Sequence, residues 1–321
     1  MDNIFLDILS ISVFFTGLLW ISEKFFNFKK NKNIFQSNIE LQKKNYILNN
    51  NKTYKKSCKL KNIKSLFPIL LLVFIIRCFF YEPFYIPSES MMPTLLPGDY
   101  IIVKKYFYGI KNPITNNILV KYHSPKRGDI IALKDPKNSR KNFVKRIIGL
   151  PGDKVVYDSI NKILTIYSNY NTIKNNKKIS FKQYVFEKYN TNSVVENKKM
   201  QETVSDVEKF NSNDNILNYN CMIYKEILDH YKYNILISHA NKNTPKLYFH
   251  QDKQPTGTWI IPPKNYFVLG DNRDNSCDSR YWGFVPENKI IGKVDYIWMS
   301  LEKKVGKWPT GINLHRIGTI N

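Results

Sequence analysis

The sequence is poor in cysteine, and its cysteines show no arrangement typical of a metal site. The four are Cys58, Cys78, Cys221 and Cys277, with no CxxC pair among them. Whether Cys221 and Cys277 pair does not follow from the sequence, because a disulfide requires Cα atoms about 4.4 to 6.8 Å apart. The chain also lacks a glycine-rich phosphate loop and an internal repeat. We therefore expect no metal-binding site.

Acidic residues are also scarce, with 26 Asp and Glu against 49 Lys and Arg, which gives a formal net charge of +23. So basic a chain raises the question of a nucleic-acid partner. However, the lysines are spread through Asn-rich stretches such as NNNKTYKK and KNNKKISFK, and the sequence has no zinc-finger spacing and no clear helix-turn-helix. We expect no nucleic-acid partner. Anionic lipid is the better match to the basic excess.

The N-terminal part contains two apolar runs. Residues 8–22 read ILSISVFFTGLLWIS without a charge, and they predict a first transmembrane helix within residues 1–22. The run falls short of a clean 18 residues, so a buried hydrophobic helix remains an alternative. No Lys or Arg precedes it and no small-x-small site follows it, so we expect a retained anchor and not a cleaved signal peptide. A second transmembrane helix is predicted at residues 65–81.

The segment between these runs sets the predicted topology. Residues 23–64 carry twelve lysines and only two glutamates, which predicts a basic cytoplasmic loop. The N-terminus and residues 82–321 would then lie on the outer side of the membrane.

After residue 81 the pattern changes to short apolar runs bounded by turn residues, such as GDIIALK, DKVVYDS and NYFVLG. No long amphipathic helical pattern lies between them, so we predict a mainly β fold with an antiparallel β-rich body. The predicted body comprises residues 82–164 and 254–321. Residues 165–253 show weak periodicity, and we predict an inserted, smaller β subdomain there without catalytic chemistry.

Three clusters in the outer part contain residues suited to catalysis: SESM with Ser90, FVKRIIGLPGD with Lys145, and GDNRDNSCDSRYWGF. A serine nucleophile needs a base, and none of the five histidines lies in a stretch typical of a catalytic triad. A lysine serves instead when burial lowers its pKa. Strand alternation around Lys145 predicts that Arg146 points outward. The alternative for Lys145 is a solvated surface charge.

The third cluster also invites comparison with a calcium-binding loop because it contains several aspartates. We exclude that interpretation, since no glycine occupies the sixth position and Trp282 occupies the twelfth.

Together, the three clusters resemble those of the bacterial type I signal peptidases. The stretches YEPFYIPSESMMPTLLPGD, KRIIGLPGDKV and GDNRDNSCDSRYWGFVP are near-verbatim forms of the motifs of that family, in its order, and WPTGINLHRIG is similar to the enterobacterial leader peptidases. The resemblance implies a membrane-bound serine endopeptidase that removes signal peptides from secretory preproteins after A-x-A-like small residues. It implies no cofactor, and a multi-pass protein of the bacterial inner membrane whose catalytic domain lies on the periplasmic side.

The resemblance also implies roles for individual residues. Ser90 matches the nucleophile and Lys145 the general base. The hydroxyl of Ser88 and the backbone N–H of Ser90 match the oxyanion hole, and Ser276 matches the serine that orients the lysine amine. Asp278 and Arg280 match an ion pair that holds the third cluster. Further structural support and the walls around the substrate are assigned to the following residues: Asp271, Arg273, Phe84, Ile86, Pro87, Ala132, Phe143 and Val144.

Two further expectations concern the surroundings of Ser90. Glu89 stands where relatives commonly have glycine, and we predict that its side chain points away from the lysine. We also predict an apolar rim that enters the outer leaflet, with ordinary core packing as the alternative; it comprises Met91, Met92, Phe84, Trp298, Trp308 and Pro309. Other functions left open are a self-cleaving Ser-Lys repressor and a catalytically silent, membrane-tethered binding module.

Overall fold

The computed structural model divides the chain into two compact units, residues Met1–Phe80 and Tyr81–Asn321. Each unit is considered by itself. The residues that the structure describes are 2–37, 65–112, 117–138, 141–170, 181–183, 187–188, 221–228, 231–238, 245–302 and 311–320.

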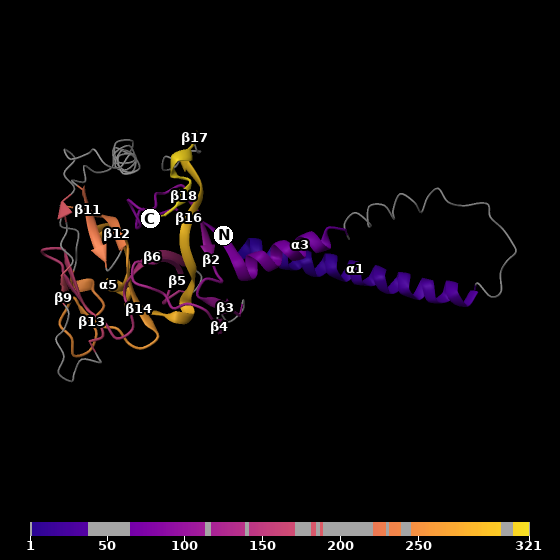
Figure 1. Cartoon of the computed structure of the whole chain (residues 1–321), viewed down its shortest axis with the longest axis horizontal. Coiled ribbons are helices and arrows are strands. Elements are labelled where there is room, and N and C mark those ends of the chain that lie inside the picture. The colour runs from indigo at the N-terminus through magenta and orange to yellow at the C-terminus, as the bar shows by residue number, and fades with distance from the viewer. Residues whose placement is uncertain are drawn as a thin grey trace. The chain divides into compact units, whose positions relative to one another are not determined.

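The first unit is helical (Figure 1). Helix α1 spans Asp2–Ser37, α3 spans Phe67–Ile75, and a π-helical turn at Ile76–Phe80 continues α3. Helix α1 therefore continues past residue 22, where we predicted the polar loop to begin. Among the described residues, one stretch is long and apolar enough to cross a membrane, Leu6–Phe25, and the apolar helix Phe67–Phe80 is shorter.

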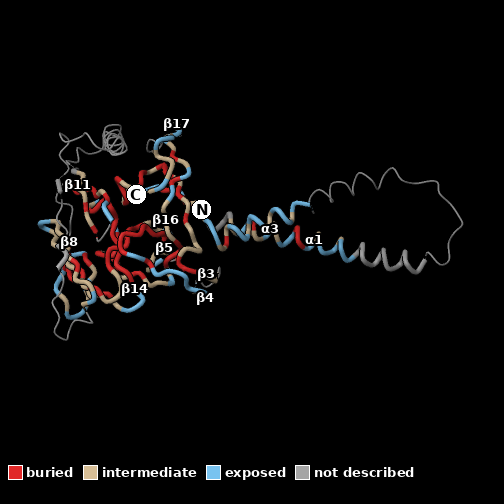
Figure 2. The backbone as a smooth tube through the Cα atoms, viewed as in Figure 1, coloured by how far each residue is buried: buried red, intermediate tan, exposed pale blue. Residues whose placement is uncertain are grey.

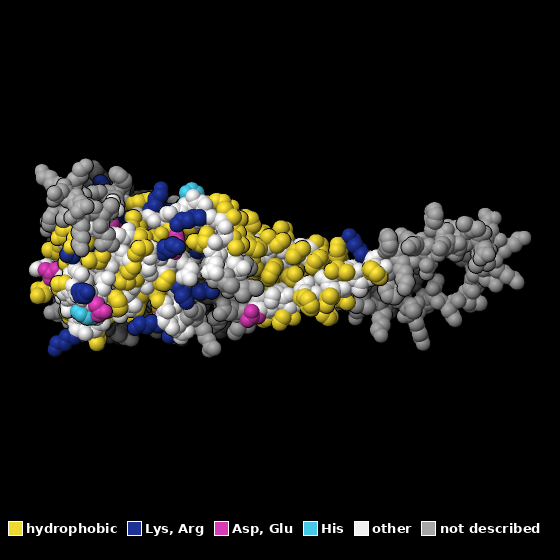
Figure 3. All heavy atoms as spheres, turned by 90° about the horizontal axis from the view of Figure 1, so that it is seen from below, with side chains coloured by type: hydrophobic (Ala, Val, Ile, Leu, Met, Phe, Trp, Pro, Cys, Tyr) yellow, Lys and Arg dark blue, Asp and Glu magenta, His cyan; other side chains and the backbone are white. Residues whose placement is uncertain are grey.

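Helices α1 and α3 approach closely at Gly17. A Cβ at this position would lie 2.8 Å from the ring of Phe67, so only glycine fits, and Trp20 packs on the same ring at 5.4 Å. The long apolar side chains point outward, and hydrophobic atoms cover the helices in Figure 3. Helices that are apolar on their exposed faces are typical of a lipid environment. The exposed set includes Ile11, Phe14, Phe15, Phe25, Ile69 and Leu72.

The second unit is built on one large antiparallel sheet, which confirms the predicted mainly β fold. Its order is β1–β2–β16–β5–β6–β14–β15, and β17 and β18 also pair with β16. The strands are β1 (Tyr81–Tyr85), β2 (Asp99–Lys104), β5 (Ile130–Lys134), β6 (Asn142–Gly149), β14 (Asn265–Leu269), β15 (Val285–Pro286), β16 (Ile290–Glu302), β17 (Gly311–Ile312) and β18 (Gly318–Thr319).

Three smaller antiparallel sheets complete the second unit, in the orders β13–β7–β8–β9, β10–β11–β12 and β3–β4. Helix α5 is a single turn after β14. The bounds are β3 (Gly109–Lys111), β4 (Ile118–Lys121), β7 (Lys154–Asp158), β8 (Ile163–Tyr167), β9 (Phe181–Gln183), β10 (Glu187–Lys188), β11 (Cys221–Leu228), β12 (Tyr231–Ser238), β13 (Thr258–Ile260) and α5 (Ser279–Trp282).

Burial explains why the central strands read as continuous apolar runs. Strands β7 and β8 alternate between buried and half-buried residues, as expected where one face is covered. Strands β5 and β14 are buried at nearly every position because both faces of the sheet are covered there. In Figure 2 the buried backbone is concentrated in this central part of the sheet.

The predicted inserted subdomain shares a core with the rest of the unit. Ile235 and Ile237 of β12 belong to the same buried cluster as Val155 of β7 and Trp259 of β13. The backbone also connects the insertion to the third cluster, GDNRDNSCDSRYWGF, which is called the third motif below. Leu236 N–H donates to the Asp271 carbonyl at 2.9 Å. The hairpin β11–β12 therefore packs into the core of the β unit.

Shared packing makes a prediction about stability. Ile235 is fully buried, and Ile235→Ala should destabilise the whole β unit by about 2–5 kcal/mol. The matched change Ile160→Ala, at a side chain that is 86% exposed, should stay within about 0.5 kcal/mol of the parent. Thermal unfolding of the detergent-solubilised protein tests both. An unchanged midpoint for Ile235→Ala would mean that the hairpin folds independently.

Candidate active site

Ser90 lies in the connection between β1 and β2. Backbone hydrogen bonds join the two ends of this connection, which we call its neck. Ile86 N–H donates to the Asp99 carbonyl at 2.9 Å, and Gly98 N–H donates to the Ile86 carbonyl at 3.0 Å. Inside this neck, Asp99 accepts from Leu96 N–H at 2.8 Å and pairs with Arg316 at 2.7 Å. The proline-rich connection is therefore a tied loop with a fixed course.

Lys145 approaches Ser90 from strand β6. Its Nζ lies 2.6 Å from Ser90 Oγ and also donates to the Val144 carbonyl at 3.1 Å. The side chain is almost fully buried, and this desolvation lowers the pKa of Lys145 to about 8. A neutral amine at this distance can accept a proton from the serine hydroxyl.

Two buried carboxylates lie near Lys145, and each is already paired with an arginine. Asp278 and Arg280 form the predicted ion pair at 2.9 Å, fully buried, and the guanidinium holds the pKa of Asp278 below its usual value against the opposing effect of burial. Asp271 accepts two hydrogen bonds from Arg146, at 2.9 and 2.7 Å. Lys145 has no ion pair of its own within the described parts of the chain.

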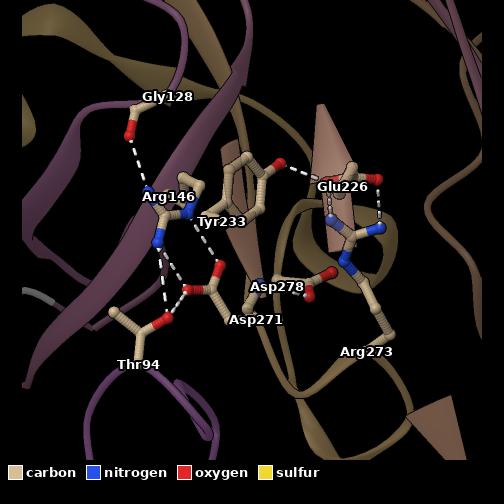
Figure 4. Close-up of polar contacts among 9 residues, drawn as sticks. Thr94, Gly128, Arg146, Glu226, Tyr233, Asp271, Arg273 and Asp278 are labelled. Atoms are coloured by element: carbon tan, nitrogen blue, oxygen red, sulfur yellow. Dashed lines mark hydrogen bonds and ion pairs between the residues drawn. The ribbon is translucent and has the colours of Figure 1, made fainter. Parts of the chain in front are cut away.

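The prediction that Arg146 points outward is wrong. Arg146 lies on the face of β6 opposite to Lys145, as alternation requires, but it is 3% exposed. Tyr233 of the β11–β12 hairpin covers it, with the guanidinium carbon 3.9 Å from the ring centre, and Figure 4 shows this stacking. Alternation identifies the face on which a side chain lies, whereas the insertion decides whether that face meets water.

The two predicted accessory serines differ in position. The hydroxyl oxygens of Ser88 and Ser90 lie 3.5 Å apart, so Ser88 is beside the predicted nucleophile. Ser276 is buried, but its hydroxyl has no hydrogen-bond partner among the described residues. The expected bond to Lys145 is absent because the amine bonds Ser90 and the Val144 carbonyl instead.

Gly270 brings the third motif against the Ser90 loop. A Cβ built at this position would collide with the Ser90 carbonyl oxygen and with Ser276 Oγ. The next contact along the chain fixes the two loops together, because Asn272 N–H donates to the same Ser90 carbonyl at 3.1 Å. Only glycine permits this approach of two backbones.

Most of the predicted wall residues gather in one apolar cluster that also contains Met91, the residue after Ser90. Phe84, Ile86 and Ala132 are buried in it and Val144 packs against it. Phe143 packs in the neighbouring cluster, with its ring 5.8 Å from Lys145 Nζ, and Pro87 is exposed.

The proposed rim is wrong in part. Met91, Met92 and Phe84 are buried core residues, at most 5% exposed, because the loop turns their side chains inward. Trp298 is 41% exposed and packs edge-on against Tyr100. The remaining two rim residues, Trp308 and Pro309, lie outside the described residues.

Glu89 and Cys277 border the site. The Glu89 carboxylate accepts from Asn275 Nδ2 at 2.9 Å in an exposed contact, and Glu89 is not among the charges that act on Lys145. Cys277 is an exposed free thiol. Burial of part of its side chain raises the pKa of Cys277. No group of three or more His, Cys, Asp or Glu suited to a metal ion occurs among the residues described.

Comparison with known proteins assigns the family. The model of the family described as signal peptidase, peptidase S26, matches residues 59–299. The chain belongs to this family. It is 48% identical over 321 residues to signal peptidase I of Buchnera aphidicola subsp. Baizongia pistaciae, covering all of both chains. It is 35% identical over 283 residues to signal peptidase I of Haemophilus influenzae, covering 80% of this chain and 74% of that protein.

A solved structure of a signal peptidase I from Enterococcus faecalis was also found. It covers 54% of this chain and 98% of its own, with 24% identity and a TM-score of 0.26.

The sequence did not reveal which residues of the insertion and of the Ser90 loop support the third motif. Arg273 forms a bidentate ion pair with Glu226 of β11, and the Tyr233 hydroxyl donates to the same carboxylate. Thr94, in the Ser90 loop, donates to Asp271 at 2.5 Å. The available signal was a lone acid, Glu226, within an apolar strand-like stretch in a region otherwise rich in lysine.

The close approach at Gly270 can be tested by substitution. Gly270→Ala should lower proteolytic activity by at least about 100-fold, because the Cβ displaces the Ser90 carbonyl and a displacement near 1 Å is costly to catalysis. The control Gly311→Ala, whose Cβ would lie 3.4 Å from its nearest neighbour, should retain activity. Comparable activity of the two variants in a peptide-cleavage assay would contradict this account.

Proposed function

We propose that this chain is a membrane-bound endopeptidase that removes signal peptides from secretory preproteins by Ser-Lys catalysis. The observation that carries the proposal is the 2.6 Å contact between Ser90 Oγ and the buried Lys145 Nζ. Membership of the signal peptidase family supports the substrate class.

In the proposed reaction, neutral Lys145 takes the proton of the Ser90 hydroxyl while Oγ attacks the scissile carbonyl carbon. The Ser90 N–H and the Ser88 hydroxyl stabilise the resulting oxyanion, and such a donor is typically worth about 2.7–4 kcal/mol. The ammonium of Lys145 then donates its proton to the leaving amine, and an acyl-enzyme on Ser90 remains. Lys145 next takes a proton from water, whose oxygen attacks the acyl carbon. The Lys145 ammonium then returns this proton to Ser90 Oγ as the acyl bond breaks, which releases the new carboxyl end of the signal peptide and restores the serine hydroxyl and the neutral amine.

Ser276 has a proposed part in this cycle. Its buried hydroxyl lacks a partner among the described residues, and it lies against Gly270 and the Ser90 carbonyl. A buried hydroxyl without a partner is costly, and we assign it the role of accepting from the lysine amine once the Ser90 proton has moved.

The proposed specificity follows from the apolar cluster beside Ser90. Phe84, Ile86 and Val144, with Ala132 beneath them, would flank an extended substrate and accept small side chains before the cut, as in an A-x-A-like site. Phe143 and Pro87 would complete the walls.

The proposed location is the bacterial inner membrane, with two spans and the β unit on the periplasmic side. The exposed apolar side chains of Leu6–Phe25 and Phe67–Phe80 support insertion into lipid. The twelve lysines of residues 23–64 support a cytoplasmic loop between the helices. The exposed Trp298 suits the membrane interface.

Substitution of either member of the pair tests the proposed function. Ser90→Ala and Lys145→Met should each abolish cleavage of a preprotein while the thermal midpoint stays near or above that of the parent, because neither change leaves a large cavity. Purified protein in detergent, a preprotein with an A-x-A site and gel analysis are sufficient. Near-normal cleavage by either variant would refute the assignment, and an inactive parent would favour the binding module.

The pH dependence gives a second test. Because only neutral Lys145 can accept the proton, kcat/KM should rise with pH through an apparent pKa of about 8 and be lost as pH falls below it. Lys111 is a matched control, since burial lowers the pKa of Lys111 to about 8 as well, although it bonds the Ile290 carbonyl and not Ser90. Lys111→Met should therefore leave the acid limb of the profile unchanged. A shifted limb would assign the titration to Lys111.

A further inference from the structure

The β11–β12 hairpin of the insertion contributes a fully buried acid, Glu226, to the polar network behind the candidate active site. Both carboxylate oxygens of Glu226 accept from the guanidinium of Arg273, one of them at 2.9 Å. The hydroxyl of Tyr233 donates to the same carboxylate. Burial, and next the charge of Glu226, raise the pKa of Tyr233 well above its usual value, so the phenol remains a donor. Figure 4 shows the three side chains converging.

The buried charges of this network balance one to one. Three arginines each face one carboxylate, in the pairs Arg146–Asp271, Arg273–Glu226 and Arg280–Asp278. All six side chains are at most 4% exposed. Lys145 is a seventh buried group, and within the described residues no carboxylate is at ion-pair distance from it.

The hairpin is connected to both of the other pairs. The Arg273 carbonyl accepts from Arg280, which holds Asp278. On the other side, the ring of Tyr233 stacks on Arg146, which holds Asp271. Asp278 and Asp271 are the acids whose charges act most strongly on Lys145. Glu226 is therefore connected to Asp278 through Arg273 and Arg280, and to Asp271 through Tyr233 and Arg146.

We propose that Glu226 is a positioning residue of the enzyme that fixes the net charge near Lys145. Because Glu226 neutralises Arg273, Asp278 remains paired with Arg280 and Asp271 remains paired with Arg146. The inference rests on the proposed function for its catalytic meaning. The charged and titratable groups that act on Lys145 are Asp271, Cys277, Asp278 and Arg280 from the third motif, and the Ser90 hydroxyl of the β1–β2 connection bonds its amine.

The proposal predicts that the acid limb of the kcat/KM profile moves in opposite directions in two single variants. In Glu226→Gln an uncompensated Arg273 adds positive charge, which favours the neutral amine and moves the acid limb of kcat/KM to lower pH. In Arg273→Gln the uncompensated Glu226 adds negative charge and moves the limb to higher pH. Each displacement should be about half a pH unit, which is a threefold gain or loss of neutral lysine at pH 7. The double variant should return the limb to that of the parent.

Two controls separate charge from packing. Glu226→Asp retains the charge with a shorter side chain, and it should keep the parental limb despite a lower thermal midpoint. Asp153→Asn breaks the buried Arg127–Asp153 pair in another part of the β unit, and it should lower stability without moving the limb. If the Gln variants do not fold, Glu226→Asp and Asp153→Asn can still be compared by their thermal midpoints and by the acid limb of kcat/KM. A displacement of the acid limb in Glu226→Asp would count against the proposal.

A second readout does not depend on proteolysis. The rate at which acetic anhydride acetylates Lys145, measured against pH by mass spectrometry of the peptide that contains it, reports the fraction of neutral amine. The pH midpoint of acetylation should move in the same direction as the acid limb of kcat/KM in each of the two single variants. Displacements that are absent, or of the same sign in both, would overturn the role of Glu226. Correct displacements in a protein whose Ser90→Ala variant still cleaves would overturn the proposed function and leave the charge coupling standing.

Discussion

The arrangement of the β unit depends on one constraint, which is the burial of a lysine amine beside a serine hydroxyl without a carboxylate to hold it. A buried ammonium requires either a counter-charge or deprotonation. The two acids near Lys145, Asp271 and Asp278, are each bound to an arginine, so neither is available as a full partner for the amine. The remaining interactions of the site serve this arrangement, since every arginine and every acid within the network must itself be paired to remain buried.

Much of the fold and the central pair could be predicted from the sequence, because each depends on local signals. Apolar runs bounded by turn residues identified the strands, and Lys145 stood out as a lysine within such a run. The partners of the charged residues could not be predicted in the same way. Alternation placed Arg146 on the face opposite to Lys145, but the side chain that covers it, Tyr233, comes from a distant insertion with weak periodicity. Ion pairs such as Arg273–Glu226 depend on which distant segments meet.

The loops around Ser90 are held by backbone contacts as well as by side-chain packing. The neck between Ile86 and Asp99 fixes the start and end of the β1–β2 connection, and Asn272 N–H holds the Ser90 carbonyl from the other side. Gly270 makes this contact possible because it has no side chain. Two loops that are far apart in the sequence thus confine one carbonyl, and the hydroxyl of the same residue is left facing Lys145. The geometry of the pair is therefore a property of both loops together with strand β6.

The same burial that lowers the pKa of Lys145 acts against stability. Unfolded, the amine has a pKa near 10.5, and in the fold this value falls to about 8. Below pH 8 the amine is protonated in both states, and the desolvated ammonium destabilises the fold by about 3 kcal/mol. Between about pH 8 and 10.5 the unfolded chain binds the extra proton, so this cost decreases as pH rises. The arginine–carboxylate pairs and the shared core of the insertion offset that cost. The insertion therefore packs behind a site whose buried lysine is itself unfavourable to the fold.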